Sequence, residues 1–166
     1  CQLKLIIGNE LVLEGGIKII LLARNRQGYG QLCRLISLAR RRSKKGQYQL
    51  TLNDFKDSTA HLFAIWIPRR QDLIQPGALP IALKTIFGEQ LWLGAILAMD
   101  GFDLDRKHGL QAIANQHAIS IVACGDIQMH VSARKPLLDT LCAIRHGLSV
   151  KSAGRLLQSN AERHLK

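Results

Sequence analysis

The sequence predicts an α/β domain with a mainly parallel sheet, open or closed into a barrel, because apolar runs of strand length alternate with segments of helical apolar spacing. The chain has 166 residues and is 47% hydrophobic, which suffices for one domain with a sizeable core. Residues 121–124 form a short apolar run of the kind that is buried on both faces, and Gly125 ends it.

Asp126 and His130 follow this run directly. Binding groups gather at the carboxyl ends of strands in such folds, because loops there present side chains from a rigid base. The two side chains therefore mark a candidate site. The alternative is that Asp126 caps the next turn and His130 is a surface residue.

Strands open the chain. A strand over residues 3–7 is expected to break at Gly8 and continue to residue 13, and a glycine turn leads into a strand over residues 17–23. Glu10 falls at the break, where a strand ends. It is either an acidic site residue or an exposed strand glutamate.

A helix of about four turns is expected after Gly28, from apolar residues spaced along one face up to Ala39. Cations at a helix C-terminus are stabilising by about 0.3 to 1 kcal/mol each, so one or two basic residues would suffice there. Five basic residues exceed that need, and a phosphate-contacting patch for nucleic acid therefore stands beside a solvated cap as an interpretation. The basic run consists of Arg40, Arg41, Arg42, Lys44 and Lys45.

The remaining segments continue the alternation of strands and helices. Gly, Pro and polar clusters separate them, and Pro136 stands at a plausible first helical position. The expected elements are a helical turn at 51–55, a strand at 61–67, a polar loop at 69–80, a helix at 81–87, a strand at 91–99, a helix at 102–117, a helix at 136–144 and a tail helix within 151–166 that joins a further domain.

The charge balance points to a polyanionic partner. Lys and Arg number 23 against 12 Asp and Glu, a formal net charge of +11, which favours nucleic acid. A soluble basic surface, or a face that meets an acidic neighbouring domain, would explain the same charge. Neither a phosphate-loop motif nor a dinucleotide-binding glycine motif occurs.

The four cysteines contain no CxxC pair, which disfavours a disulfide framework or a zinc ribbon. No apolar run of membrane-spanning length and no signal peptide is present, so the sequence predicts an intracellular protein without membrane association. The chain starts at Cys1 within a strand pattern, and we expect it to be a piece of a longer protein.

Several blocks of the sequence, in this order, resemble the PHP (polymerase and histidinol phosphatase) domain of bacterial C-family DNA polymerases, above all the error-prone alpha-subunit type. They are Gly-Asn-Glu at 8–10, Leu-Leu-Ala-Arg-Asn at 21–25 with Gly-Tyr-Gly-Gln-Leu-Cys-Arg-Leu-Ile at 28–36, Gly-Asp-Ile-Gln-Met-His at 125–130 and Asp-Thr-Leu-Cys-Ala-Ile-Arg at 139–145. The resemblance implies a distorted (β/α)7 PHP barrel, here a partial barrel that lacks the first β/α units. Residues 1–150 would be barrel and 151–166 the start of the connection to the polymerase core.

The resemblance also implies a metal cluster at the strand ends, with zinc or manganese in an intact PHP site. Glu10 matches the family's Glu position and Asp126 its late Asp, with His130 nearby. Gln128 stands where a His is expected, and Gln is a poor ligand for a metal such as zinc. The family's His-x-His motif would precede this chain. Glu10, Asp126 and His130 are therefore expected to form an incomplete metal site.

Two classes of function follow from the resemblance, and the small number of metal ligands favours the first. The first is a mainly structural segment of an error-prone DNA polymerase that acts in DNA-damage-induced mutagenesis and translesion synthesis. This segment alone would be inactive, and the parent would be a DNA-directed DNA polymerase (a nucleotidyltransferase) with magnesium in a site outside it. The alternative is a metal-dependent phosphoesterase or 3′–5′ exonuclease of the PHP type. A nucleic-acid-binding module without catalysis is a third reading. The implied setting is cytoplasmic, with DNA, polymerase core domains, a sliding clamp and other mutagenesis proteins as partners.

Overall fold

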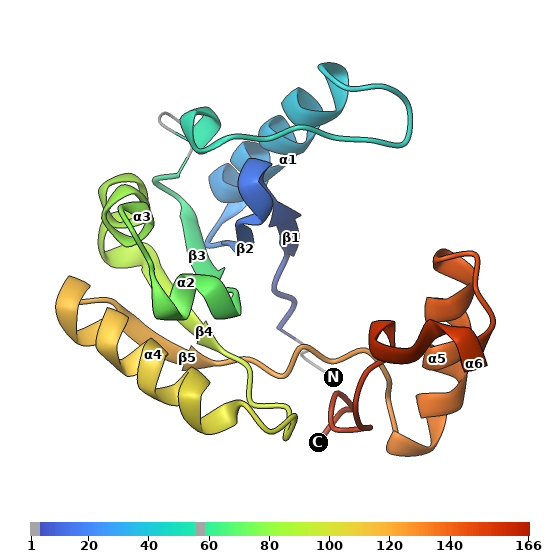
Figure 1. The fold of residues 1–166 in the computed structure, drawn as a ribbon. Coiled ribbons are helices and arrows are strands. Elements are labelled where there is room, and N and C mark those ends of the chain that lie inside the picture. The colour runs from blue at the N-terminus through green and yellow to red at the C-terminus, as the bar shows by residue number, and fades with distance from the viewer. Residues whose placement is uncertain (1–3, 56–58) are drawn as a thin grey trace. The chain divides into compact units, whose positions relative to one another are not determined.

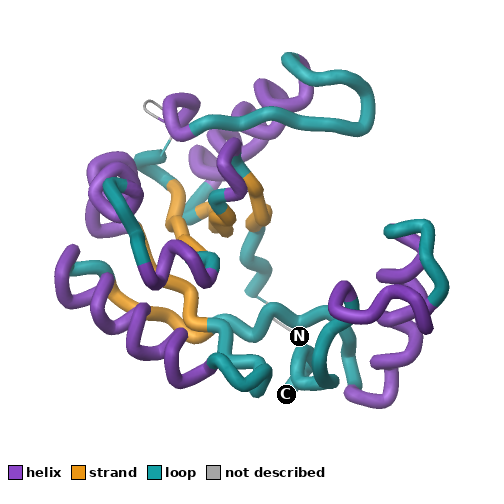
Figure 2. Tube along the Cα trace, in the orientation of Figure 1, coloured by secondary structure: helices purple, strands orange, loops and turns teal. Residues whose placement is uncertain are grey.

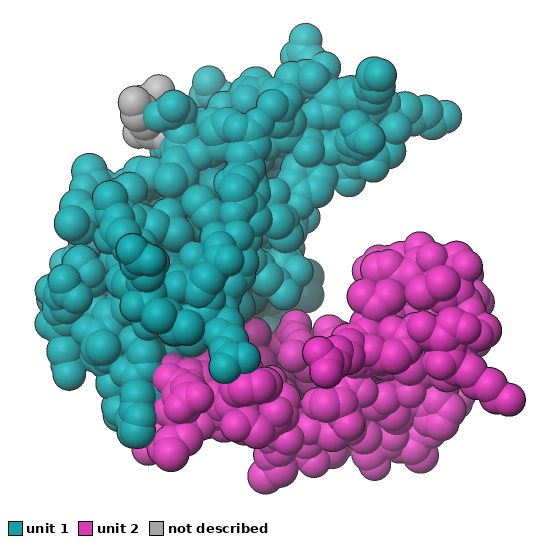
Figure 3. Space-filling view, in the orientation of Figure 1, with its two compact units in different colours: residues 1–95, 108–122 teal, residues 96–107, 123–166 magenta. Residues whose placement is uncertain are grey.

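The computed structural model describes residues 4–55 and 59–166, which contain a five-stranded sheet and six α-helices (Figure 1). The α/β class predicted from the sequence is confirmed. The chain divides into two compact units, residues 1–95 with 108–122 and residues 96–107 with 123–166 (Figure 3). We call them unit 1 and unit 2.

The strands follow the order β1-β2-β3-β4-β5 in the sheet. β1 pairs with β2 and β2 with β3 in antiparallel fashion, whereas β3 and β4 are parallel. The expectation of a mainly parallel sheet was therefore wrong for the first three strands. Their bounds are β1 Gly8–Val12, β2 Lys18–Ala23, β3 Leu62–Ile67, β4 Leu91–Ala95 and β5 Ser120–Ala123.

The connections explain the mixed pairing. A short 3-10 helix, Glu14–Gly16, joins β1 to β2, and so short a link permits only antiparallel neighbours. After β2 the chain runs out along a helix and returns as a long loop before β3 (Figure 2). β3 therefore starts beside the end of β2, with Leu62 opposite Ala23.

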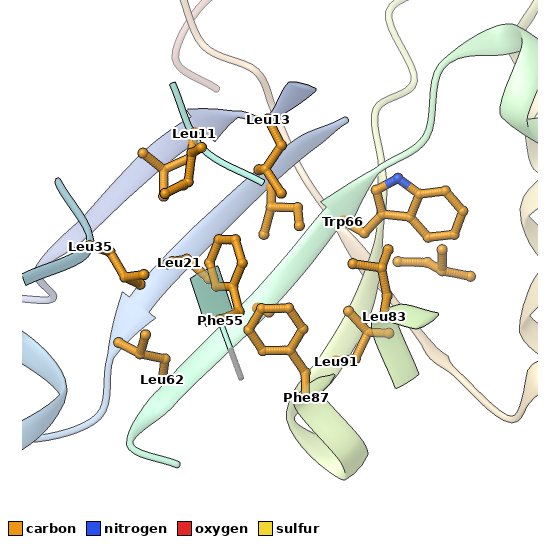
Figure 4. Packing of buried hydrophobic residues seen from close by; sticks show 14 of the residues in the cluster. Leu11, Leu13, Leu21, Leu35, Phe55, Leu62, Trp66, Leu83, Phe87 and Leu91 are labelled. Atoms are coloured by element: carbon orange, nitrogen blue, oxygen red, sulfur yellow. The ribbon is translucent and has the colours of Figure 1, made fainter. Parts of the chain in front are cut away.

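Helices supply the cover for one face of the sheet in unit 1. Alternate strand residues, such as Ile19 and Leu21 of β2, are fully buried and belong to the same cluster as helical residues such as Leu35 and Leu83 (Figure 4). The helices are α1 Arg26–Arg41, α2 Arg70–Ile74, α3 Leu79–Phe87, α4 Asp103–His117, α5 Lys135–Arg145 and α6 Val150–Ala153.

The long helix expected after Gly28 is confirmed as α1. The Asn25 side chain caps it by accepting a hydrogen bond from the Gly28 amide at 2.9 Å. Gly28 packs so closely on His61, the residue before β3, that a Cβ there would lie 2.1 Å from the His61 carbonyl oxygen. This close approach explains why the position is a glycine and fixes the helix against the sheet.

Other boundaries differ from those expected. The strand expected over residues 3–7 is not found at residues 4–7, since β1 begins at Gly8 rather than breaking there. Residue 3 lies outside the described residues. The strand expected over residues 91–99 ends at Ala95. The segment expected to be a polar loop, residues 69–80, contains α2. The Asp72 carboxylate stabilises the first turn of α2 by accepting a hydrogen bond from the Arg69 amide.

Strand β5 exists as predicted, but it is the last strand of the sheet and not buried on both faces, since Ile121 is 41% exposed. The prediction of a tail helix within residues 151–166 was wrong as well. This segment contains only the end of α6 and a 3-10 turn, Gly154–Leu156, because Gly154 takes a positive φ of 48° that ends α6. None of the helices described is both long and apolar enough to cross a membrane.

Candidate functional site

Glu10 lies in the middle of β1, opposite Ile20 of β2, and not at a strand end as expected. Its carboxylate makes an ion pair of 3.0 Å with the Nζ atom of Lys18, at the start of β2. Half of the Glu10 side chain is exposed. The residue thus occupies a solvated sheet surface where its charge is already matched by a cation.

Asp126 follows β5, in unit 2, with a positive φ of 44°. Its carboxylate forms an ion pair with the Nη1 atom of Arg163, and both side chains are mostly buried, at 15% and 20% exposure. The backbone supports this pair, because the Gln128 and Met129 amides donate to the Arg163 carbonyl at 2.8 and 3.2 Å. Asp126 is therefore bound to the last segment of the chain.

A second set of ion pairs in unit 2 contributes to the charge around Arg163. Arg106 donates to Asp100 at 2.7 Å and to Asp103 at 2.5 Å. The hydrogen bonds from Arg106 hold the pKa of Asp100 below its usual value, although burial opposes this. Burial, followed by the charge of Arg106, lowers the pKa of Arg163, and Asp100 opposes that shift. Unit 2 thus holds an alternating network of arginines and aspartates.

His130 is exposed and lies on the same segment as Asp126. It lines a surface hollow of about 430 Å³ together with Arg134 and three leucines of α5. Gln128, in the position where the family resemblance leads one to expect a histidine, lines the same hollow. The hollow presents one imidazole and one guanidinium over apolar walls.

The three candidate ligands are divided between the two units. Asp126 and His130 belong to unit 2 and Glu10 to unit 1. Within residues 4–55 and 59–166, no group of three or more His, Cys, Asp or Glu side chains is arranged to hold a metal ion. The assignment of zinc or manganese to Glu10, Asp126 and His130 stays a prediction.

The basic run at the end of α1 contains two residues that contact other side chains and three that are exposed without an ion pair to any described residue. Arg42 donates two hydrogen bonds to Asp54, at 3.1 and 2.8 Å, and Arg40 lies 5.3 Å from the centre of the Tyr48 ring. Burial raises the pKa of Asp54, but hydrogen bonds from Arg42 and Thr51 outweigh it, and the pKa lies below its usual value. Arg40 and Arg42 therefore fasten the return loop to α1.

The other three basic residues of the run, Arg41, Lys44 and Lys45, are exposed and make no ion pair with any carboxylate that the structure describes. Arg41 lines a hollow of about 570 Å³ on α1 that also includes Arg34. Arg34 was not among the predicted residues, although its helical spacing of seven to Arg41 places both on one face. The free cations are suited to phosphate oxygens, which need charge rather than fixed geometry.

Comparison with known proteins gives no match to a family model. It does find relatives named error-prone DNA polymerase. The protein of Pseudomonas fluorescens is 43% identical over 165 residues, that of Pseudomonas syringae pv. tomato 45% over 168 residues and that of Methylococcus capsulatus 41% over 164 residues. These matches take in 98–99% of the chain but only 15–16% of each relative. The chain is thus similar, along nearly all its length, to one segment of much longer proteins.

Proposed function

We propose that this chain is a segment of an error-prone DNA polymerase that acts in DNA-damage-induced mutagenesis and translesion synthesis, and that the segment is mainly structural. The observation that carries the proposal is the identity of 41–45% over almost the whole chain to relatives of that name. The parent would be a DNA-directed DNA polymerase in the cytoplasm. Its magnesium-dependent nucleotidyl transfer would take place outside these residues. The sliding clamp and other mutagenesis proteins would bind the parent.

We further propose that unit 1 is part of a PHP barrel. The sheet face opposite the buried core supports this idea, because β2, β3 and β4 present apolar side chains there beside the Glu10–Lys18 ion pair. Phe63 and Trp92 lie edge to face at 5.2 Å between their ring centroids, and with Leu22 they line a hollow of about 210 Å³. A barrel interior requires such inward-facing apolar side chains on neighbouring strands.

The ion pairs of the two acidic candidates support a structural role. Glu10 is paired with Lys18, and Asp126 is paired with Arg163. A metal ion would have to displace these cationic side chains before it could use either carboxylate. Because several negatively charged or imidazole ligands are needed for each ion, the charge balance favours a degraded site.

The alternative function is a metal-dependent phosphoesterase or 3′–5′ exonuclease. The test is to assay primer extension and 3′ excision, with manganese and with zinc, in the parent polymerase carrying Asp126→Asn, with Arg163→Met as the matched control. We expect primer extension in both variants and no excision activity even in the unaltered enzyme. Metal-dependent excision that Asp126→Asn abolishes and Arg163→Met preserves would establish the alternative.

DNA contact by the exposed cations at the end of α1 is the third part of the proposal. Replacing Arg41, Lys44 and Lys45 by Ala in the parent enzyme should flatten the plot of log K against log salt by up to about 0.9 per lost phosphate contact on duplex DNA. The control replaces three exposed cations of other segments, Lys107, Lys151 and Arg155, and should leave the slope unchanged. Equal slopes in all three proteins would make the run a solvated cap only.

A further inference from the structure

Helix α5 carries an apolar stripe that the rest of unit 2 leaves exposed. Leu137, Leu141 and Ile144 follow one another at i, i+4 and i+7, which places them on one face. Their exposed fractions are 49%, 56% and 67%. Ala143 is the one buried residue of α5 and Leu138 is half-buried, so the helix leaves three of its four large apolar side chains exposed. Contiguous exposed apolar residues of this kind mark an interaction surface.

Two hollows adjoin the stripe and share part of their walls. They measure about 430 and 620 Å³, and both are lined by Gln128, Leu138 and Leu141. The first extends to His130 and Arg134, and the second to Arg145 and His146. Together they form a groove with an apolar floor and basic residues at each end, which we call the α5 groove.

The charge around the α5 groove is strongly one-sided. Residues 130–157 contain five Lys or Arg residues and a single carboxylate, Asp139. That carboxylate is already held by the Nζ atom of Lys135, at 2.7 Å. Arg134 and Arg145 have no ion pair with a carboxylate in the described part of the chain. The rim of the groove therefore offers uncompensated positive charge beside leucine side chains.

We propose that the α5 groove binds an amphipathic helical segment of a protein partner, with leucine-like side chains on one face and carboxylates on its flanks. An apolar face that packs on the stripe removes both surfaces from water, and the carboxylates meet the cationic rim. A second copy of this chain fits less well, because two chains of net charge +11 repel each other. Nucleic acid also fits less well, since its phosphates would lie against Leu137 and Leu141 and lose hydration there.

The test uses a fluorescent synthetic helical peptide with Leu at i, i+4 and i+7 and Glu on both flanks, titrated with the 166-residue chain and followed by anisotropy. The Glu peptide is expected to bind, and a peptide with Lys in place of each Glu is not. Leu141→Glu should weaken binding at least about tenfold, because it places charge on the apolar floor. The control Leu104→Glu adds the same charge at another leucine of unit 2, 65% exposed, and should leave binding unchanged.

Both substitutions lie on exposed side chains, so equal unfolding midpoints by circular dichroism are expected and would show that each variant folds. Equal binding of the Glu and Lys peptides, or full binding by Leu141→Glu, would overturn the proposal. Sedimentation that reveals a dimer lost in Leu141→Glu would assign the face to a second copy instead. Displacement of the bound Glu peptide by a DNA oligonucleotide would assign it to nucleic acid.

Discussion

The two units of the molecule are stabilised in different ways. Unit 1 has a continuous core in which side chains from four strands and three helices are buried together. In unit 2 the buried apolar residues are Ala98, Met129, Ala143 and Ala153, as far as the structure describes it. Unit 2 relies instead on its network of arginines and aspartates and on backbone pairing of its last segment. The difference teaches that unit 1 is stabilised mainly by its apolar core, whereas unit 2 is stabilised mainly by polar contacts.

The same substitution made in each unit is the strongest way to break this comparison. Leu21→Ala, at a fully buried position of β2, should lower the free energy of unfolding by about 2 to 5 kcal/mol, because it removes apolar contacts and leaves a cavity. Leu141→Ala, on the exposed stripe of α5, should change it by less than about 0.5 kcal/mol. Denaturant titration by circular dichroism measures both, and equal losses would contradict the comparison.

A pair of glycines on α1 sharpens the account of how unit 1 packs. Gly28→Ala should destabilise the protein by about 1 to 3 kcal/mol, since its Cβ would lie 2.1 Å from the His61 carbonyl oxygen. Gly30→Ala meets nothing within 4 Å and should stabilise the helix by about 0.5 to 1 kcal/mol. Thermal unfolding of the two variants is the measurement. If both variants shift the unfolding midpoint in the same direction, the close contact between Gly28 and the His61 carbonyl oxygen does not determine how α1 affects stability.

The charged network gives the corresponding prediction for unit 2. Arg163→Met removes the cation that faces the mostly buried Asp126 carboxylate. We expect the free energy of unfolding to fall by about 1 to 3 kcal/mol. Lys166→Met removes a more exposed ion pair with Glu162, four residues earlier in the chain, and should lower the free energy of unfolding by less than about 0.5 kcal/mol. Amide hydrogen exchange at Gln128 and Met129 reports the effect locally. Unchanged exchange in Arg163→Met would mean that backbone pairing alone holds the segment.

The last stability prediction concerns the pH dependence of Asp72, the one buried charged residue among the described residues of unit 1. Burial raises the pKa of Asp72, but hydrogen bonds from Arg69 outweigh it and the pKa lies below its usual value. The pair therefore contributes stability that is full above the unfolded pKa of about 3.9 and is lost as the pH falls through the lower folded pKa. Asp72→Asn and Arg69→Met should each reduce this acid-side loss, by about 1 kcal/mol. Acid titration of all three proteins checks it, and an unaltered profile in either variant would refute the assignment.

The sequence allowed local features to be predicted better than distant ones. Helix α1 could be predicted because its apolar period, its basic end and its glycine start lie within one stretch. The antiparallel pairing of β2 with β3 could not, since it depends on a long return loop that is fastened by Arg42 and Asp54. Helical spacing alone would have been enough to predict that Arg34 lies beside Arg41 in the basic surface of α1.

The candidate site shows the same limit. Asp126 could be picked out because it directly follows a strand, but its partner Arg163 lies far along the chain in a segment without regular structure. No local pattern connects the two residues. Glu10 was assigned to a strand end because Gly8 was interpreted as a break, whereas the backbone pairs through Gly8 with Leu22.

Ion pairs with the chain's own Lys18 and Arg163 are expected to keep Glu10 and Asp126 from binding a metal ion. Metal content tests this expectation most directly. The purified 166-residue chain is dialysed with zinc and, separately, with manganese, freed of unbound ions and subjected to elemental analysis beside Asp126→Ala. We predict clearly less than one metal ion per chain in both proteins, because Asp126 faces Arg163 and Glu10 faces Lys18. One or more ions per chain, lost on Asp126→Ala, would contradict the account.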